Sequence, residues 1–253
     1  MNCSIEVLKG FKGDLIELKN YPNLKELEIV NNEIDEELKY LPVGLKVLKI
    51  RGIKFNQELK NLPEGLEVLE IFFCKNFKLD NLPEGLKELH IYSDKFNQEL
   101  DNLPGCLGKL RIVCSRNFNK ELDNLPESLD ILQIINCFNF NKELDNLPLG
   151  LKKLEIHNTN FNQKLDKLPE SLKKLKIYYC KNFNKELNNL PEGLEELEIY
   201  KCKKFNEKLE NLPLSLKKLN IGKKYLDYYS LEEVKGMIPL GCELYVDDKK
   251  IDL

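Results

Sequence analysis

Tryptophan and alanine are both absent from this sequence of 253 residues, and arginine is rare beside lysine. With its many Asn and Ile residues, this bias resembles that of an AT-rich coding sequence and by itself excludes no fold. An excess of basic charge is also missing, because 39 Lys and Arg stand against 42 Asp and Glu and leave a net charge of −3. Proteins that bind nucleic acid usually carry a basic face, so the composition argues against nucleic acid as a partner.

Long hydrophobic segments are missing as well. No apolar run approaches the roughly 18 residues that a membrane-spanning helix needs, and the N-terminal stretch MNCSIEVLKGFKGDLIEL lacks the apolar core of a signal peptide. We therefore expect no membrane partner. Eight Cys residues would indicate disulfides in a small exported protein, but among the asparagines only Asn2 lies in a glycosylation sequon. The sequence predicts a cytoplasmic protein with reduced thiols.

The sequence contains instead one repeat unit that occurs about ten times. A proline recurs every 20–22 residues from Pro42 to Pro213, and an earlier, imperfect copy holds Tyr21-Pro22. After these prolines runs the pattern Leu-x-x-Leu-x-Ile, whose last three positions have the two-residue period of a β-strand. Its ten copies begin at Leu24, Leu45, Leu66, Leu86, Leu107, Leu129, Leu151, Leu172, Leu194 and Leu216.

One repeat unit is too small to fold alone. Burying five or six apolar side chains contributes roughly 10 kcal/mol, at ~1.5–3 kcal/mol for each side chain. Ordering some twenty residues costs more, at ~1–2 kcal/mol for each backbone residue. Stacked units share one continuous core and pair their strands into a parallel sheet. The repetition therefore predicts a mainly β solenoid.

The strand pattern resembles the leucine-rich repeat, in which the ninth position is Asn or Cys. Most side chains at this position can hydrogen-bond the backbone of the turn that leaves the strand, whereas Ile53 cannot. The residues that we assign to it are Asn32, Ile53, Cys74, Asp94, Ser115, Cys137, Thr159, Cys180 and Cys202.

A Phe-Asn pair in most units makes the resemblance closer to the FNIP repeat family, which is frequent in social amoebae and their giant viruses. The pairs begin at Phe55, Phe96, Phe118, Phe140, Phe161, Phe183 and Phe205, while Phe77-Lys78 and Ile34-Asp35 depart from the pattern. The resemblance implies a leucine-rich-repeat-like right-handed coil, with a parallel sheet on the concave face and irregular or 3-10 segments on the convex face. It also implies a protein-binding role, in the host cytoplasm for a viral member.

Proteins of this family often carry an F-box ahead of the repeats and act as substrate receptors of ubiquitin ligases. We expect no F-box here, because the first coil begins close to the N-terminus. Three parts are expected: an N-terminal cap coil over residues 1–19, ten repeats over residues 20–222, and a C-terminal cap over residues 223–253. Ile5 and Val7 should form a first strand in register with Leu27 and Ile29.

The C-terminal cap should contain a short helix over about residues 231–236. Ser230 and Glu233 have the spacing of a capping box, and the segment CELYVDD after the helix should form a last strand with Leu244 and Val246 inward. Within the repeats, each convex arc is too short for a full helix. Phe and the Leu that follows it, as in Phe183 and Leu187, should point inward and stack from coil to coil.

Two columns of side chains should face outward on the concave sheet. The charged column contains Glu28, Lys49, Glu70, His90, Arg111, Gln133, Glu155, Lys176, Glu198 and Asn220. The second column, called the stripe below, contains Val30, Arg51, Phe72, Tyr92, Val113, Ile135, His157, Tyr178, Tyr200 and Gly222, with Phe73 and Tyr179 beside it. A row of large apolar side chains facing solvent is unusual, and aromatic residues dominate binding hot spots.

The stripe therefore predicts a surface for a protein partner. The residues that we expect to contact it are Phe72, Tyr92, His157, Tyr178 and Tyr200, with His90 and Arg111 of the charged column. Two plainer interpretations stay open. The stripe could be cross-strand stacking that stiffens the sheet, and the charged column could be a surface whose charges only pair with one another. Ordinary exposed histidines are the plainer interpretation of His90 and His157.

Chemistry that would support catalysis or a cofactor is not indicated. His90 and His157 lie about three coils apart, too far to share a metal, and Cys180 and Cys202 in adjacent coils should be buried structural thiols. We find no Gly-rich phosphate loop, no Ser-His-Asp arrangement and no paired-carboxylate cleft. The sequence favours a non-enzymatic, monomeric protein-binding module without a metal or cofactor. The alternative is a structural protein that assembles through the ends or edges of the solenoid.

Overall fold

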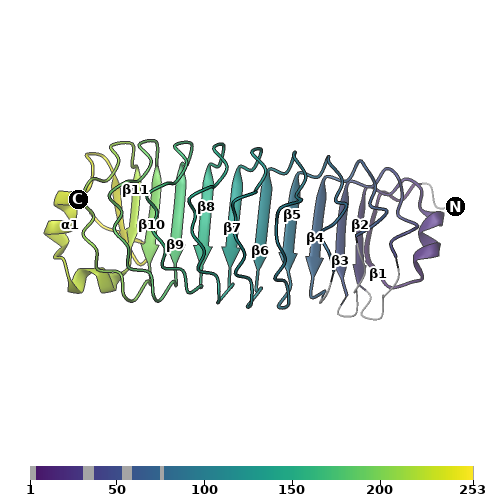
Figure 1. Ribbon diagram of the computed structural model, residues 1–253, viewed down its shortest axis with the longest axis horizontal. Coiled ribbons are helices and arrows are strands. Elements are labelled where there is room, and N and C mark those ends of the chain that lie inside the picture. Colours follow the sequence, from purple (N-terminus) through teal and green to yellow (C-terminus); the bar gives the residue numbers. More distant parts are fainter. Residues whose placement is uncertain (1–3, 31–36, 53–58, 75–76, 253) are drawn as a thin grey trace.

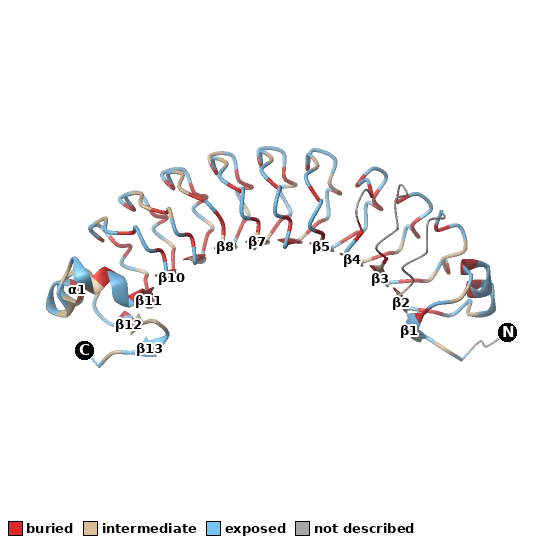
Figure 2. Cartoon of the chain, turned by 90° about the horizontal axis from the view of Figure 1, so that it is seen from below, coloured by how far each residue is buried: buried red, intermediate tan, exposed pale blue. Residues whose placement is uncertain are grey.

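The fold is a curved solenoid with one continuous sheet on its inner side. The computed structural model describes residues 4–30, 37–52, 59–74 and 77–252. One thirteen-stranded sheet follows the order of the sequence from β1 to β13, and the two termini lie at its opposite ends (Figure 1). The strands line the concave side of an arc, and the connecting segments form its convex side (Figure 2). The prediction of a mainly β solenoid is confirmed.

Twelve strands pair in parallel, and the last turns back antiparallel to β12. The strands are β1 (Val7–Phe11), β2 (Glu26–Val30), β3 (Val47–Arg51), β4 (Val68–Phe72), β5 (Glu88–Tyr92), β6 (Lys109–Val113), β7 (Ile131–Ile135), β8 (Lys153–His157), β9 (Lys174–Tyr178), β10 (Glu196–Tyr200), β11 (Lys218–Ile221), β12 (Glu243–Val246) and β13 (Lys249–Lys250). Two 3-10 helices, η1 (Leu15–Asn20) and η2 (Lys223–Asp227), and one α-helix, α1 (Leu231–Met237), lie in the end coils. No helix among the described residues is long and apolar enough to cross a membrane.

The interior consists of columns of like side chains. In every strand from β2 to β11 the Leu and Ile of Leu-x-Ile are buried, and each faces its equivalent in the next strand. The convex arcs supply a second column, in which Phe rings from Phe77 to Phe205 and then Tyr225 stack with centroids 5.6–6.1 Å apart. The prediction that Phe183 and Leu187 point inward is confirmed, because both are buried.

The Asn of the Phe-Asn pair forms a ladder that the sequence reasoning did not foresee. Its side-chain oxygen accepts a hydrogen bond from the backbone N–H of the equivalent Asn in the next coil, at 2.8–3.3 Å. The ladder runs through Asn97, Asn119, Asn141, Asn162, Asn184 and Asn206. Each coil thus satisfies a backbone donor of its neighbour, because a backbone N–H without a partner is costly.

The ninth-position column differs from its predicted membership at one coil. Ser93, not Asp94, is buried there, and its hydroxyl donates to the carbonyl oxygen of Cys74 at 2.5 Å. The reason is that this coil is shorter. In several other coils one residue with positive φ lies between the end of the strand and the buried side chain, whereas here Ser93 follows β5 directly. Asn32, Ile53, Ile34-Asp35 and Phe55-Asn56 lie outside the described residues.

At the N-terminal end the predicted register is wrong. Leu8 pairs with Leu27 and Phe11 with Ile29, whereas Val7 pairs with Glu26 and is 50% exposed. Gly10 adopts a left-handed backbone with φ +67 at an irregularity between Leu8 and Phe11. The bulge gives β1 one residue more than β2 between these two pairs, so the paired residues are 19 and then 18 positions apart, not 22, and Phe11 is the buried side chain.

At the C-terminal end the predicted cap elements are present. Helix α1 begins after Ser230, and both hydrogen bonds of the capping box with Glu233 form. Leu244 of β12 is buried and Val246 packs against the core, as expected. The two-residue strand β13 then covers the open edge of β12, which natural sheets commonly protect against unwanted strand pairing.

Candidate functional site

The concave face carries the two predicted columns in register. Glu28, Lys49 and Glu70 face one another across β2, β3 and β4, and the same alignment continues to Asn220 of β11. The stripe is aligned in the same way from Val30 to Tyr200. Equivalent residues of adjacent parallel strands lie side by side, so each column is a continuous row. The prediction that the charged column faces outward is wrong for His90, Glu155, Glu198 and Asn220, which neighbouring side chains bury.

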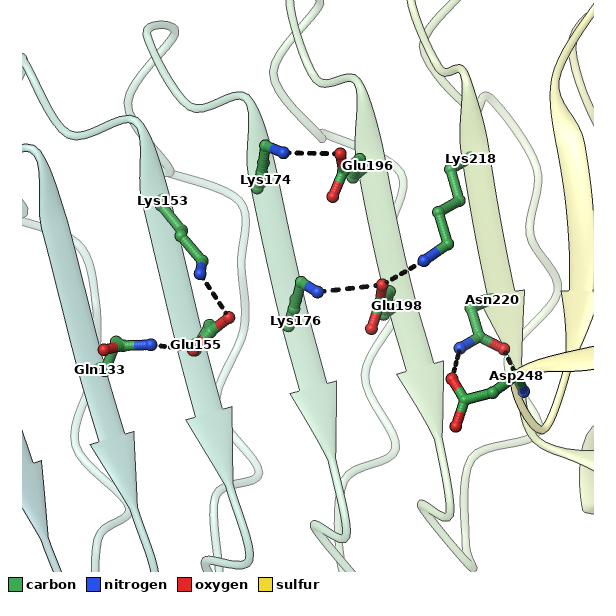
Figure 3. A network of polar contacts seen from close by, with 10 residues as sticks. All are labelled: Gln133, Lys153, Glu155, Lys174, Lys176, Glu196, Glu198, Lys218, Asn220 and Asp248. Carbon is green, nitrogen blue, oxygen red and sulfur yellow. Dashed lines mark hydrogen bonds and ion pairs between the residues drawn. The ribbon is translucent and has the colours of Figure 1, made fainter.

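Much of the charged column is internally paired (Figure 3). Lys176 and Lys218 both contact Glu198, with Nζ to Oε1 distances of 3.1 and 2.8 Å, and Lys153 contacts Glu155 at 2.8 Å. Burial alone would raise the pKa of Glu198, but the two lysines outweigh it and hold this pKa below its ordinary value. Toward the C-terminal end the column is therefore a self-complementary surface.

Arg111 is the exception in the middle of the sheet. Its strand neighbours in the charged column are His90 and Gln133, so no carboxylate lies directly beside it. The Nη1 group donates to the hydroxyl of Tyr92 at 3.0 Å, while the buried Nε has no hydrogen-bond partner among the described residues. Arg111 thus keeps an unsatisfied donor and an unpaired charge on the concave face.

His90 and His157 lie on the concave face at different depths. His90 is only 8% exposed, and its Nε2 lies 3.1 Å from Oε2 of Glu88, so it is not the exposed histidine of the plainer interpretation. Burial, reinforced by Lys109, lowers the pKa of His90, and burial also lowers the pKa of His157. The uncharged form of both rings is favoured at neutral pH.

Aromatic rings gather in two clusters along the stripe. In the N-terminal cluster, Phe72 stacks on Tyr92 with centroids 4.5 Å apart, and the Arg51 guanidinium lies 3.7 Å from the Phe72 centroid. In the C-terminal cluster, Tyr178 stacks between His157 and Tyr200, at 4.1 and 5.3 Å. Val113 and Ile135 connect the two clusters. Burial, with Glu155 and Glu198 nearby, raises the pKa of Tyr178 to about 12, so its hydroxyl stays protonated.

Phe73 and Tyr179 extend the clusters toward the rim and adopt an unusual backbone conformation. They are 60% and 40% exposed, and their φ angles are +62 and +57. A left-handed backbone is costly for a bulky residue, whereas Asn adopts it readily. Asn136 and Asn158 occupy the same place in other coils with φ +55 and +51. The sequence reasoning placed both aromatic residues beside the stripe but had no signal for this backbone.

The buried thiols make hydrogen bonds to backbone carbonyl groups. Cys180 and Cys202 donate to the carbonyl oxygens of Ile156 and Ile177, at 3.6 and 3.4 Å. Burial raises the pKa of Cys137 to about 12, which keeps that thiol protonated. In the part of the chain that the structure describes, no three His, Cys, Asp or Glu side chains gather as metal ligands.

Repeated coils, a concave parallel sheet and Leu-x-Ile columns define a leucine-rich-repeat-like solenoid. Residues 138–180 and 161–202 match the FNIP repeat. Residues 138–202 therefore contain FNIP repeats, in agreement with the resemblance that the Phe-Asn and Leu-Pro pairs indicated.

Solved structures show the same architecture. CroV588, a novel circular leucine-rich-repeat protein, is similar over 95% of this chain and 40% of its own, with 26% identity and a TM-score of 0.70. YopM from Yersinia enterocolitica is similar over 85% of this chain and 48% of its own, with 23% identity and a TM-score of 0.54. An internalin from Listeria monocytogenes shares the fold at 17% identity, 93% and 85% coverage, and a TM-score of 0.50. This chain thus spans less than half of CroV588 and YopM, and no curated protein matches it.

Proposed function

We propose that this protein is a non-enzymatic binding module of the cytoplasm that presents its concave face to a protein partner. The exposed, left-handed Phe73 and Tyr179 carry the proposal. Strained residues persist where the surrounding structure compensates, and they cluster at functional sites. Asn fills the same place in two other coils at lower conformational cost, so the backbone does not require an aromatic side chain there. Simple stiffening of the sheet does not require one either, because Asn158 occupies the same place beside β8 without a ring.

The arrangement of the surrounding residues supports the same surface. Tyr and Arg are enriched in binding hot spots, which lie near the centre of an interface. Arg111 and Tyr92 lie on neighbouring strands in the middle of the sheet, and the strand neighbours of Arg111 in the charged column are His90 and Gln133 rather than carboxylates. Repeat solenoids commonly use their extended concave surfaces for binding. A partner that covers Arg111 would therefore contact both aromatic clusters.

The test removes rings from the stripe without removing the core. A variant that combines Tyr92→Ala, Tyr178→Ala and Tyr200→Ala loses three stacked pairs worth ~0.5–1.5 kcal/mol each, which lowers the melting temperature by roughly 3–18 °C. Affinity capture from host cytoplasm is compared between this variant and the parent protein. Proteins that the parent retains should be lost.

A matched control removes three exposed apolar side chains elsewhere. Val43, Leu149 and Leu214 are highly exposed in turns that precede strands, and their triple replacement by Ser should leave capture unchanged. Equal loss of captured proteins in both variants would contradict the proposal. So would a fall of tens of degrees in the melting temperature of the tyrosine variant, since the rings would then be structural.

A further inference from the structure

A pocket with a volume of about 390 Å³ lies where the chain leaves strands β9 to β12, next to the C-terminal end of the concave face. It adjoins the C-terminal aromatic cluster, because Tyr179 belongs to both. The remaining lining residues are Lys181, Lys201, Lys203, Gly222, Lys223, Lys224 and Asp247, and the surface of the pocket is almost entirely carbon. Lysine side chains line apolar surfaces with their stems while the charged groups reach water. The pocket therefore combines an apolar interior with a positively charged border.

Most lysines of the pocket have no carboxylate partner among the described residues. Elsewhere a lysine commonly contacts a carboxylate of the preceding coil, as Lys120 does with Glu99 at 2.7 Å. At the pocket, Lys201 donates to the hydroxyl of Tyr179 and Lys224 pairs with Asp227. Lys181, Lys203 and Lys223 have no carboxylate partner among the described residues. Positive charge thus concentrates here on a protein whose net charge is −3.

Asp247 gives the pocket a hydrogen-bond acceptor that is not used. It lies in the turn between β12 and β13, where its backbone N–H donates to the carbonyl oxygen of Ile221 at 2.9 Å. Its Oδ1 is buried and has no hydrogen-bond partner among the described residues. Asp247 is the one acidic side chain among the residues that line the pocket. A ligand that brings an N–H donor as well as negative charge therefore suits the pocket better than one with acceptors alone.

We propose that this pocket binds an acidic peptide segment of the protein partner. An aromatic or aliphatic side chain of the segment inserts among the lysine stems and Tyr179, its carboxylates pair with Lys181, Lys203 and Lys223, and a backbone N–H donates to Asp247. Acidic motifs are recognised by basic clusters in this way. The inference rests on the proposed function and specifies the chemistry of the partner at one end of the concave face.

Charge and hydrogen bonding favour a peptide over a polyphosphate chain. A phosphate backbone offers acceptors only and would be repelled by Asp247, whereas a peptide carries N–H donors next to its carboxylates. The binding of nucleic acid also depends on many phosphate contacts along a basic surface, whereas carboxylates alternate with lysines in the charged column at both ends of the sheet.

The probe is a short fluorescein-labelled peptide in which Asp and Glu flank a central Phe. Fluorescence anisotropy with the full chain should show binding that weakens with added salt. Two control peptides replace either the acidic residues by Asn and Gln or the Phe by Gly, and each should bind at least about tenfold more weakly. A labelled single-stranded oligonucleotide should bind more weakly than the acidic peptide. Binding that is equal for all peptides, or strongest for the oligonucleotide, would overturn the proposal.

The matched variants differ only in where two charges are removed. Lys203→Gln with Lys223→Gln should weaken peptide binding by about tenfold or more, and Lys9→Gln with Lys12→Gln in the N-terminal coil should not change it. Equal peptide affinity in both double variants would exclude the pocket. Capture by the tyrosine-stripe variant is measured separately. Loss of capture without any effect of the pocket lysines would overturn only this inference, whereas peptide binding without stripe-dependent capture would overturn only the proposed function.

Discussion

The interior of the solenoid and its concave surface differ in how strictly they repeat. Inside, Phe stacks on Phe, and Leu and Ile face their equivalents through successive coils, with ring centroids at nearly constant distances. On the concave face the same stacking places Tyr92 beside Val113 and Ile135 beside His157. A buried position must match its neighbours in shape, because interiors are close-packed. A surface position is free of this condition, so variation there is available for recognition.

The largest expected effect breaks the interior column. Phe183→Ala removes a buried ring that lies between Phe161 and Phe205, and should lower the free energy of unfolding by ~3–5 kcal/mol. Phe138→Ala is the control, because this ring is 41% exposed and stands outside the column. Denaturant unfolding followed by circular dichroism measures both. A parent-like curve for the Phe183 variant would place that ring outside the core.

The next effect tests the asparagine ladder. Asn162→Ala removes the acceptor for the backbone N–H of Asn184, so the free energy of unfolding should fall by ~1–3 kcal/mol. Asn139→Ala is the matched control, since the Asn139 side chain is exposed and outside the ladder. Amide hydrogen exchange at Asn184 should accelerate in the first variant only. Unchanged exchange there would show that the ladder does not protect the backbone.

A smaller effect concerns the paired part of the charged column. Because Lys218 and Lys176 hold the pKa of Glu198 below the ordinary glutamate value of 4.5, ionised Glu198 stabilises the fold above that pH. This contribution is lost as the pH falls below 4.5 toward the folded-state pKa. Glu198→Gln should lower the free energy of unfolding by ~1–2 kcal/mol at neutral pH. It should also make the free energy of unfolding change less as the pH falls. Unfolding curves at several pH values test it, and identical acid dependence in both proteins would contradict the assignment.

The smallest expected effect is at Phe73, an exposed residue beside the stripe. Phe73→Asn should leave stability unchanged or raise it by up to ~1 kcal/mol, because Asn tolerates a left-handed backbone, yet it should weaken partner capture. The reverse change, Asn158→Phe, places an aromatic residue at the equivalent position of another coil and should destabilise by a similar amount. Thermal melts of both variants provide the measurement. A clearly less stable Phe73 variant would mean that the ring stabilises the fold.

Periodic features could be predicted from the sequence, and local irregularities could not. The spacing of Leu and Ile determines which residues pair from β2 to β11, and the Phe column follows from the same spacing. At β1 the bulge around Gly10 shifts the register, and one residue fewer makes Ser93 rather than Asp94 the buried polar group. A bulge or a shortened turn leaves the hydrophobic period of the repeated strands unchanged. The repeat pattern therefore does not predict either irregularity.

On the candidate binding surface, too, the periodic features could be predicted and the irregular ones could not. The two concave columns could be assigned from strand alternation, including the positions of Tyr178 and Tyr200. The pocket was missed because its lining comes from the turns of successive coils and from Asp247 in the cap, which no single motif connects. The left-handed conformation of Phe73 and Tyr179 was missed because aromatic residues rarely adopt it.

The direction of the asparagine ladder has a consequence for how such chains change in length. Each rung accepts from the coil that follows it, so a complete unit inserted between two others finds an acceptor on one side and a donor on the other. Duplication or loss of whole units therefore leaves no backbone group unsatisfied at the junction. Every added unit also lengthens the arc. Gain or loss of units could therefore fit the concave face to larger or smaller partners without any change in the packing of the core.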